Sequence, residues 1–307
     1  MAGIRTETMT VNMGPQHPST HGVLRLVLEL DGETVVSVSP TIGYLHTGIE
    51  KTAEQKKWQQ VIPLVERMDY LGAQSNSLAF VLAVEKMLGL EMPDRVQAIR
   101  VLIAELQRIS SHLVWFGTHG MEIGAITAML YAFREREILM NLNELLAGFR
   151  FFPSYIRVGG LREDIPRGFK EAVAAFLDRF PGKLDEYETL ITKNPIWLGR
   201  TRGVGVISVQ DCHSWGLYGP IARAAGDDYD VRRAFPYTGY ETYDFDVIGA
   251  SNGDVYDRYI VRMAEMRECV KICRQALDRI APVGEFAVKD RRIVPPPKDE
   301  VYTEMEA

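Results

Sequence analysis

Two histidines on one conformationally restricted loop are the residues of this chain best suited to chemistry. They lie in the segment Gly14-Pro15-Gln16-His17-Pro18-Ser19-Thr20-His21-Gly22. Proline fixes φ near about −65° and glycine permits positive φ, so the backbone itself sets the shape of this loop. An imidazole titrates near neutral pH and can give or take a proton. His17 and His21 are therefore candidate proton donors or ligands, and the alternative is that they only cap and pack the loop.

A second candidate is the cluster Arg67-Met68-Asp69-Tyr70-Leu71-Gly72, which combines a cation, a carboxylate and a phenol. A tyrosine hydroxyl can donate a hydrogen bond to a carbonyl oxygen or supply a proton. The alternative is a capping arrangement at the start of a helix, with Tyr70 half-buried.

The elements that must position these residues follow from hydrophobic periodicity. Alternating residues predict strands at 7–13, 23–30 and 34–39, with Asp31-Gly32 as a hairpin turn, and so a small antiparallel sheet. A polar, helix-favouring composition predicts a helix at 46–60, and a run that is apolar nearly all round predicts a buried helix at 78–88. Apolar residues at three- and four-residue steps from Ile99 to Leu113 predict a long helix that begins at Pro93, and further helices are expected at 123–147, 166–180 and 254–280. The expected fold class is therefore α+β and mainly helical, with His112 as a hydrogen-bonded core or interface histidine.

Composition narrows the class of protein. The chain has 307 residues and a formal net charge of −6, which argues against a nucleic-acid binder because such proteins carry a basic patch. Its longest nearly apolar run, 123–133, is far shorter than the roughly 20 residues that span a bilayer, and the N-terminus lacks the apolar stretch of a secretory signal. Cys212, Cys269 and Cys273 form no CxxC pair, so we expect core thiols and no metal site.

Several motifs together carry a resemblance to a known family. In order along the chain they are GPQHPSTHGVLRLVLELDGE, IGYLHTGIEK, ERMDYLG, LVWFGTHGMEIGAIT, YAFREREI, YIRVGG and MRECVKICRQAL. The sequence strongly resembles the 49 kDa or D subunit of proton-pumping NADH-quinone oxidoreductase, respiratory complex I, over nearly its whole length.

The resemblance implies a helical core like that of the large subunit of nickel–iron hydrogenases, in a single domain at 1–307. Its regions would be an N-terminal β-sheet region at 1–45, a helical core at 46–180 and a mixed α/β region at 181–307. Asp69-Tyr70-Leu71-Gly72-Ala73 replaces a hydrogenase cysteine motif, so a quinone site is implied where hydrogenases hold metal. His21 and Tyr70 match the family's quinone ligands and proton donors, with His17 as support for the loop.

Further positions match residues that act around the quinone in this family. Arg67 resembles an arginine beside a 4Fe–4S cluster held by a neighbouring subunit, and Asp69 belongs to the same motif. Glu122 stands where relatives usually carry an aspartate that pairs with the loop histidine and passes the signal of quinone reduction onward. Phe152 stands where many relatives carry a titratable histidine near the cluster, which suggests a less pH-dependent cluster potential and a low-potential quinone such as menaquinone.

The resemblance also implies partners and a location. The expected activity is that of an NADH:quinone oxidoreductase and proton translocase as a multi-subunit complex, with no activity of this chain alone. Expected partners are the iron–sulfur cluster subunit, a 30 kDa-type subunit and a membrane-arm subunit, at the cytoplasmic side of a bacterial inner membrane. Relatives continue past Pro295-Pro296-Pro297, so we expect a C-terminally truncated chain. The alternative is the large subunit of a hydrogenase-like membrane complex.

Overall fold

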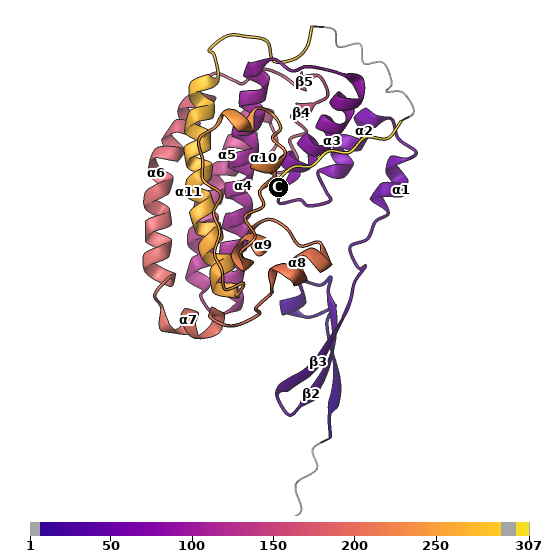
Figure 1. Ribbon diagram of the computed structural model, residues 1–307, viewed down its shortest axis with the longest axis vertical. Helices are drawn as coiled ribbons and strands as arrows, with labels where there is room; N and C mark the ends of the chain where they lie inside the picture. Colours follow the sequence, from indigo (N-terminus) through magenta and orange to yellow (C-terminus); the bar gives the residue numbers. More distant parts are fainter. Residues whose placement is uncertain (1–6, 290–298, 307) are drawn as a thin grey trace, which may run out of the picture. The chain divides into compact units, whose positions relative to one another are not determined.

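The computed structural model describes residues 7–289 and 299–306, so Pro295, Pro296 and Pro297 lie outside the described residues. The chain divides into two compact units, Met1–Gln55 and Lys56–Ala307. The first contains the sheet and the second contains the long helices (Figure 1). The mainly helical α+β class is thereby confirmed. The single-domain organisation with regions 1–45, 46–180 and 181–307 stays a prediction.

The first unit is a three-stranded antiparallel sheet in the order β1-β2-β3. Its strands are β1 Met9–Met13, β2 Arg25–Asp31 and β3 Thr34–Thr41, close to the three predicted strands. Gly32 at φ +61° makes the tight turn between β2 and β3, as its Asp-Gly sequence predicts. The short 3₁₀ helix η1, Pro18–Thr20, lies in the loop between β1 and β2, and the helix α1, Ile49–Ala53, follows the sheet.

The helix predicted over 46–60 is wrong as a single element. Instead α1 ends at Ala53 and a separate helix, α2, spans Trp58–Val65. Lys57 has extended backbone angles, φ −68° and ψ 143°, and its backbone N–H donates to the side-chain oxygen of Gln60. This capping interaction starts a new helix where propensity alone would continue the old one.

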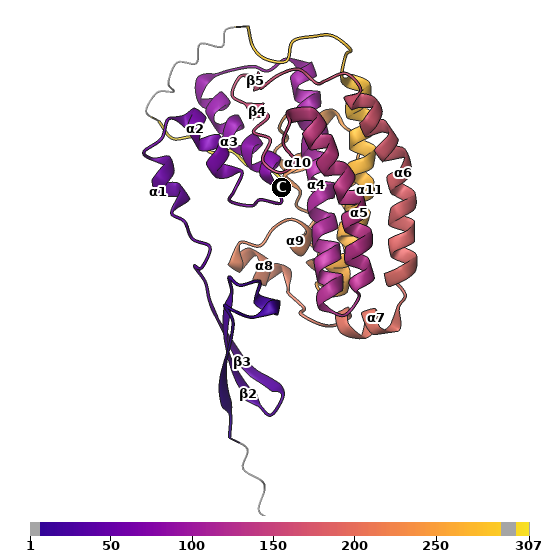
Figure 2. The same cartoon turned by 180° about the vertical axis from the view of Figure 1, so that it is seen from behind.

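Long helices packed side by side form the core of the second unit (Figures 1 and 2). They are α4 Asp94–Glu122, α5 Ile126–Ala147, α6 Phe169–Ile191 and α11 Val255–Arg279. Helix α4 packs against both α5 and α11, while α6 packs against α5 and α11 on the other side. The apolar stripe predicted from Ile99 to Leu113 is buried along α4, so the packing expected from its spacing is confirmed.

Two helix boundaries differ from the predicted ones. The helix expected at 78–88 begins earlier, as α3 Ala73–Leu88, and ends before Gly89 as predicted. The helix expected at 166–180 continues through Pro181 to Ile191. Leu184, Tyr187 and Ile191 are all buried beyond that proline. Their burial favours continuation more than the missing proline N–H opposes it.

Shorter elements complete the second unit. A hairpin of β4 Ile156–Arg157 and β5 Gly160–Leu161 lies near α3, and Gly160 also bridges to Ala287. The helices α7 Pro195–Thr201, α8 Val209–Trp215, α9 Pro220–Ala225 and α10 Val231–Ala234 and the 3₁₀ helix η2 Tyr240–Thr242 join α6 to α11. Within the described residues, none of the helices has the length and apolar character that crossing a membrane requires.

Candidate functional site

The loop between β1 and β2 is held rigid by its own backbone and by one buried threonine. The Thr20 side chain is buried, and its hydroxyl donates to the carbonyl oxygens of Pro15 and His17 at 3.2 and 3.0 Å. Gly14 has φ +89°, and a Cβ there would stand 2.1 Å from the carbonyl oxygen of Leu24. Only glycine fits that position, because such an approach excludes any side chain.

The two loop histidines have different environments. The Nδ1 atom of His17 accepts a hydrogen bond from the backbone N–H of Ser19 at 3.1 Å, so His17 caps the 3₁₀ helix η1. His21 has left-handed backbone angles, φ 53° and ψ 20°, and follows that helix directly. Both residues are exposed. The loop thus uses one imidazole for its own structure and holds the other at a fixed, accessible position.

The turn at 66–72 lies in the second unit and ends where α3 begins. The Asp69 carboxylate accepts from the backbone N–H of Leu71 at 3.0 Å, and its backbone carbonyl accepts from the Asn76 amide at 2.9 Å. The Gln107 side chain donates to the carbonyl oxygen of Leu71, which joins the turn to α4. Asp69 therefore shapes the turn but does not cap the helix, because no side chain of the described residues caps α3 at Gly72. Tyr70, however, is 52% exposed, so its hydroxyl is available to a ligand.

Arg67 and Phe152 were both predicted to lie near a neighbouring subunit's cluster, and the structure brings them into contact. The Arg67 guanidinium lies over the Phe152 ring, 4.4 Å from its centre, and donates to the carbonyl oxygen of Pro63 at 2.6 Å. A cation over an aromatic face is attracted by the ring's quadrupole. The Phe152 ring and the Pro63 carbonyl together therefore hold the cation at 67.

Glu66 is the residue that fixes this arrangement, and sequence reasoning missed it. Its carboxylate is completely buried. It accepts hydrogen bonds from the Ser154 backbone N–H and hydroxyl, both at 2.7 Å, and from the Ser77 hydroxyl at 3.1 Å. The turn that carries Arg67 and Tyr70 is thereby tied to the segment that carries Phe152. The sequence gives no signal for this role, since the partners are distant along the chain.

Glu122 is the last residue of α4 and is exposed. Gln107, which contacts the turn at 66–72, lies on the same helix. At about 1.5 Å of rise per residue, Glu122 stands about 22 Å further along the helix axis. Within the second unit, the structure therefore separates Glu122 from Tyr70. His119 precedes Glu122 by one turn, and burial lowers the pKa of His119 despite the opposing effect of the Glu122 charge.

Buried charged groups in the second unit form a network that sequence reasoning also missed. The His112 Nε2 atom lies 2.8 Å from a Glu265 carboxylate oxygen, which confirms the prediction of a hydrogen-bonded core histidine. Arg223 pairs with the same glutamate and, at 2.8 Å, with Glu306. Burial lowers the pKa of His112, and its bond to Glu265 opposes that shift without cancelling it. This network joins α4, α9, α11 and the segment 299–306 into one core.

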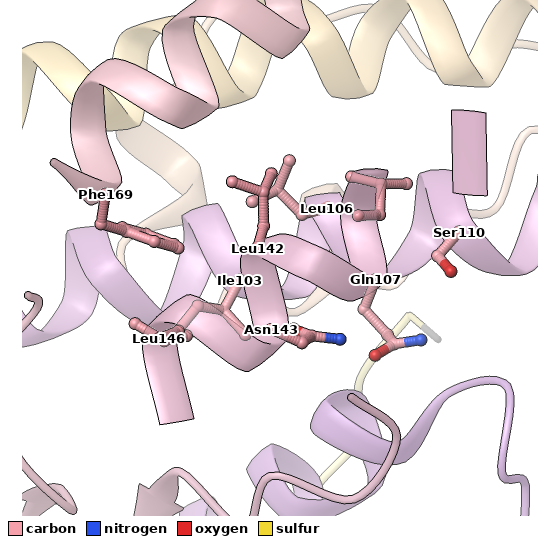
Figure 3. Close-up of a pocket in the computed structure, with 9 residues that line it drawn as sticks. Ile103, Leu106, Gln107, Ser110, Leu142, Asn143, Leu146 and Phe169 are labelled. Carbon is pink, nitrogen blue, oxygen red and sulfur yellow. The ribbon is translucent and has the colours of Figure 1, made fainter. Parts of the chain in front are cut away.

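The cavity between α4 and α5 is too small for a ligand. Its volume is about 10 Å³, and it is lined by apolar side chains with the amides of Gln107 and Asn143 (Figure 3). That volume admits at most one water molecule. Gln107 extends from this cavity to the carbonyl oxygen of Leu71, so the cavity belongs to the support of the turn at 66–72.

The cysteines are core residues, as expected. Cys212, Cys269 and Cys273 are all buried and unpaired, and burial raises the pKa of Cys269 and of Cys273 well above the usual range. Across residues 7–289 and 299–306, no group of three or more His, Cys, Asp or Glu side chains is arranged to hold a metal ion.

Comparison with known proteins places the chain in one family. The model of the family described as respiratory-chain NADH dehydrogenase, 49 Kd subunit, matches residues 122–307. A D subunit of NADH-quinone oxidoreductase from Roseiflexus sp. (strain RS-1), the one numbered 2, is 57% identical over 303 residues, which cover 98% of this chain and 73% of that relative. The NADH-quinone oxidoreductase D subunit of Geotalea uraniireducens (strain Rf4) is 56% identical over 301 residues, 98% of this chain and 77% of that relative.

Proposed function

Because the chain belongs to the family of NADH-quinone oxidoreductase D subunits, the 49 kDa subunits of the respiratory-chain NADH dehydrogenase, we propose that it supplies the quinone-binding residues of that multi-subunit enzyme. The observation that carries the proposal is the loop at 14–22, which is fixed by Gly14 and Thr20 and leaves His21 exposed. A rigid loop that presents one imidazole has the form of a binding loop rather than of a connector.

His21 and Tyr70 are the proposed donors to the two quinone oxygens. Reduction of a quinone by two electrons places negative charge on both oxygens, and two protons must follow. A donor at each oxygen stabilises that charge as it develops and can deliver a proton. The exposed hydroxyl of Tyr70 and the imidazole of His21 have the required chemistry. His17 and Asp69 support this function by holding the loop and the turn in place.

The electrons would come from a 4Fe–4S cluster held by a neighbouring subunit, with NADH as the donor to the complex. We propose that Arg67 lies near that cluster, where a cation favours the more negative, reduced state. Phe152 holds the Arg67 guanidinium in place and has no titratable group. We therefore expect a cluster potential with little pH dependence, and menaquinone as the quinone.

Glu122 is proposed to receive the signal of quinone reduction and to pass it toward the membrane arm. Its distance along α4 from the turn at 66–72 fits a role beyond the head group of the quinone. We also propose that the helical unit shares the fold of nickel–iron hydrogenase large subunits. The complex would lie at the cytoplasmic side of the inner membrane, with a cluster subunit, a 30 kDa-type subunit and a membrane-arm subunit as partners.

Substitution of both donors in the assembled complex tests the proposal. We expect His21→Ala and Tyr70→Phe each to lower quinone reduction by about 10²-fold or more, since positioned general acids contribute about 10²–10⁴-fold. NADH oxidation by an artificial acceptor should persist in both variants. Matched controls are His213→Ala and Tyr218→Phe, which alter exposed residues of the same types in the second unit. Full quinone reduction in the donor variants would show that the loop has only a structural role.

A further inference from the structure

Arg136 on α5 is a nearly buried cation enclosed by aromatic rings. Its guanidinium lies 5.0 Å from the centre of the Phe151 ring and 5.5 Å from that of Phe133, and the residue is only 8% exposed. Placing a charged group in such surroundings is costly unless a partner compensates for the lost water. It therefore matters which group, if any, compensates the charge of Arg136.

No carboxylate in the described part of the chain forms an ion pair with Arg136. Its Nη1 atom lies 3.1 Å from the sulfur of Met140, a weak acceptor, and its Nε atom is buried and finds no hydrogen-bond partner among residues 7–289 and 299–306. The adjacent carboxylate, Glu137, is bound at 2.5 Å to Arg150. Burial lowers the pKa of Arg136, and the positive charge of Arg150 adds to that effect while Glu137 opposes it.

Two other arginines close to Arg136 in the sequence do pair with carboxylates of α5. Arg134 pairs with Glu135 and Glu186, and Arg150 pairs with Glu137 and Glu144. These carboxylates satisfy cations that are more exposed than Arg136. Arg136 is the most buried of these three arginines, yet the described chain provides no carboxylate for it.

The Phe151 ring that lies against Arg136 is 42% exposed, and a chain of ring contacts continues from it to the turn at 66–72. The Phe151 and Phe152 rings are 5.9 Å apart, and Phe152 carries the Arg67 guanidinium. We call Phe151, Phe152, Arg67 and Arg136 the aromatic patch. Arg67 donates to a backbone carbonyl oxygen and forms no ion pair within residues 7–289 and 299–306, so the aromatic patch carries two uncompensated cations.

We propose that the aromatic patch is a docking surface for another subunit of the complex, which places a carboxylate on the Arg136 guanidinium from an otherwise apolar surface. Charge complementarity fixes the chemistry of this partner, since the guanidinium fork binds a carboxylate through two parallel hydrogen bonds. Aromatic residues and arginine are also the side chains that dominate binding at protein interfaces. The inference rests on the proposed function in taking the partner to be a subunit of the same complex, and its patch shares Arg67 and Phe152 with the proposed surroundings of the cluster.

Docking covers Phe151 and removes the remaining water from Arg136. The ion pair then forms in a dry environment, where breaking it is costly for both partners. The position of the patch has a consequence for the quinone site, because Arg67 lies on the same turn as Tyr70 and contacts the Phe152 ring. Docking at Arg136 therefore also restricts the Phe151-Phe152 segment against which Arg67 packs.

The test compares Arg136→Gln and Arg136→Met with the control Arg134→Gln, which alters a more exposed arginine of α5, in complexes purified from membranes. We expect both Arg136 variants to release one subunit about thirty-fold faster or more, the size expected for loss of one member of a buried charged pair. The control should dissociate at the wild-type rate. Arg136→Met also tests for a purely internal role, because methionine packs well between rings. The full chain carrying it should keep its wild-type melting temperature.

A photo-reactive phenylalanine at position 151 identifies the partner. We expect a cross-link to a peptide of another subunit that contains Asp or Glu close to apolar residues. A cross-link to lipid or to a second copy of this chain would overturn the proposal, as would wild-type dissociation of both Arg136 variants. Subunit release and quinone reduction are separate readouts. Loss of docking in Arg136→Gln with full quinone reduction in His21→Ala and Tyr70→Phe would refute the proposed function alone.

Discussion

Replacement of Glu66 is the most direct test of how this structure holds the turn that carries Arg67 and Tyr70. The Glu66 carboxylate is completely buried and accepts three hydrogen bonds, two of them from Ser154 and one from Ser77. Glu66→Ala removes all three and leaves the Ser154 N–H without an acceptor. Glu66→Gln keeps the size of the side chain, and the amide oxygen can still accept from that N–H.

The magnitude follows from these contacts. A hydrogen bond to an ionised group contributes about 1.5–3 kcal/mol, and the cost of desolvating the carboxylate offsets part of that gain. We expect Glu66→Ala to lower the free energy of unfolding by about 3–5 kcal/mol and Glu66→Gln by about 1–2 kcal/mol. For a domain of this size, 1 kcal/mol corresponds to about 2–4 °C, so Glu66→Ala should melt about 6–20 °C below the wild type.

Thermal unfolding of the full chain measures this effect, with Glu163→Ala as the control. Glu163 pairs with Arg162 at the surface, and such pairs contribute about 0–1 kcal/mol. In the assembled complex, Glu66→Ala should also reduce quinone reduction more than NADH oxidation by an artificial acceptor. A melting temperature within about 1 °C of the control would refute the reasoning that Glu66 holds the turn.

Three further predictions concern the loop, the core and the cluster. Gly14→Ala should disrupt the loop at 14–22 and lower quinone reduction in the complex, because its Cβ would stand 2.1 Å from a backbone carbonyl oxygen; activity equal to that of the wild type would contradict this. Denaturation at graded pH should show stability falling below about pH 6.5, where His112 becomes protonated in the unfolded chain while burial keeps it neutral in the folded one. The free energy of unfolding should fall by about a further 3 kcal/mol between pH 4.5 and 2, where Glu105 takes up a proton. Burial opposes ionisation of Glu105, but the charges of Arg108 and Arg232 outweigh burial and lower its pKa to about 2. A flat profile from pH 7 to 3 would contradict both. Phe152→His should make the cluster midpoint fall with rising pH between 6 and 8 in redox titrations, and an unchanged slope would argue against a cluster near position 152.

Local signals predicted most of the fold. The strands, the β2–β3 turn and the long helices α4, α5 and α11 follow from alternation, from Asp31-Gly32 and from apolar residues at helical spacing. The errors lie where other interactions override propensity. The Gln60 side chain starts α2 where a continuous helix was expected, and burial of Tyr187 and its neighbours carries α6 past Pro181.

The candidate site was predicted residue by residue, but its internal geometry was not. Motifs indicated His21, Tyr70, Arg67 and Phe152, because each stands in a recognisable run of residues. The contact of Arg67 with Phe152 and the buried support by Glu66 could not be predicted. Such contacts join segments that are distant along the chain, and single-sequence patterns describe only neighbours.

The sequence by itself determined which groups are available for chemistry and which elements carry them. Prolines and glycines fix the backbone of the loop at 14–22, and periodicity fixes the buried face of α4, because both effects act between residues close in the chain. Only the tertiary structure decided which charges are compensated. It buries Glu66 and pairs Arg223 with Glu265, yet it leaves Arg136 between two rings without a carboxylate in the described chain. Solvation and pairing of a charge depend on everything packed around it, and that environment exists only in the folded protein.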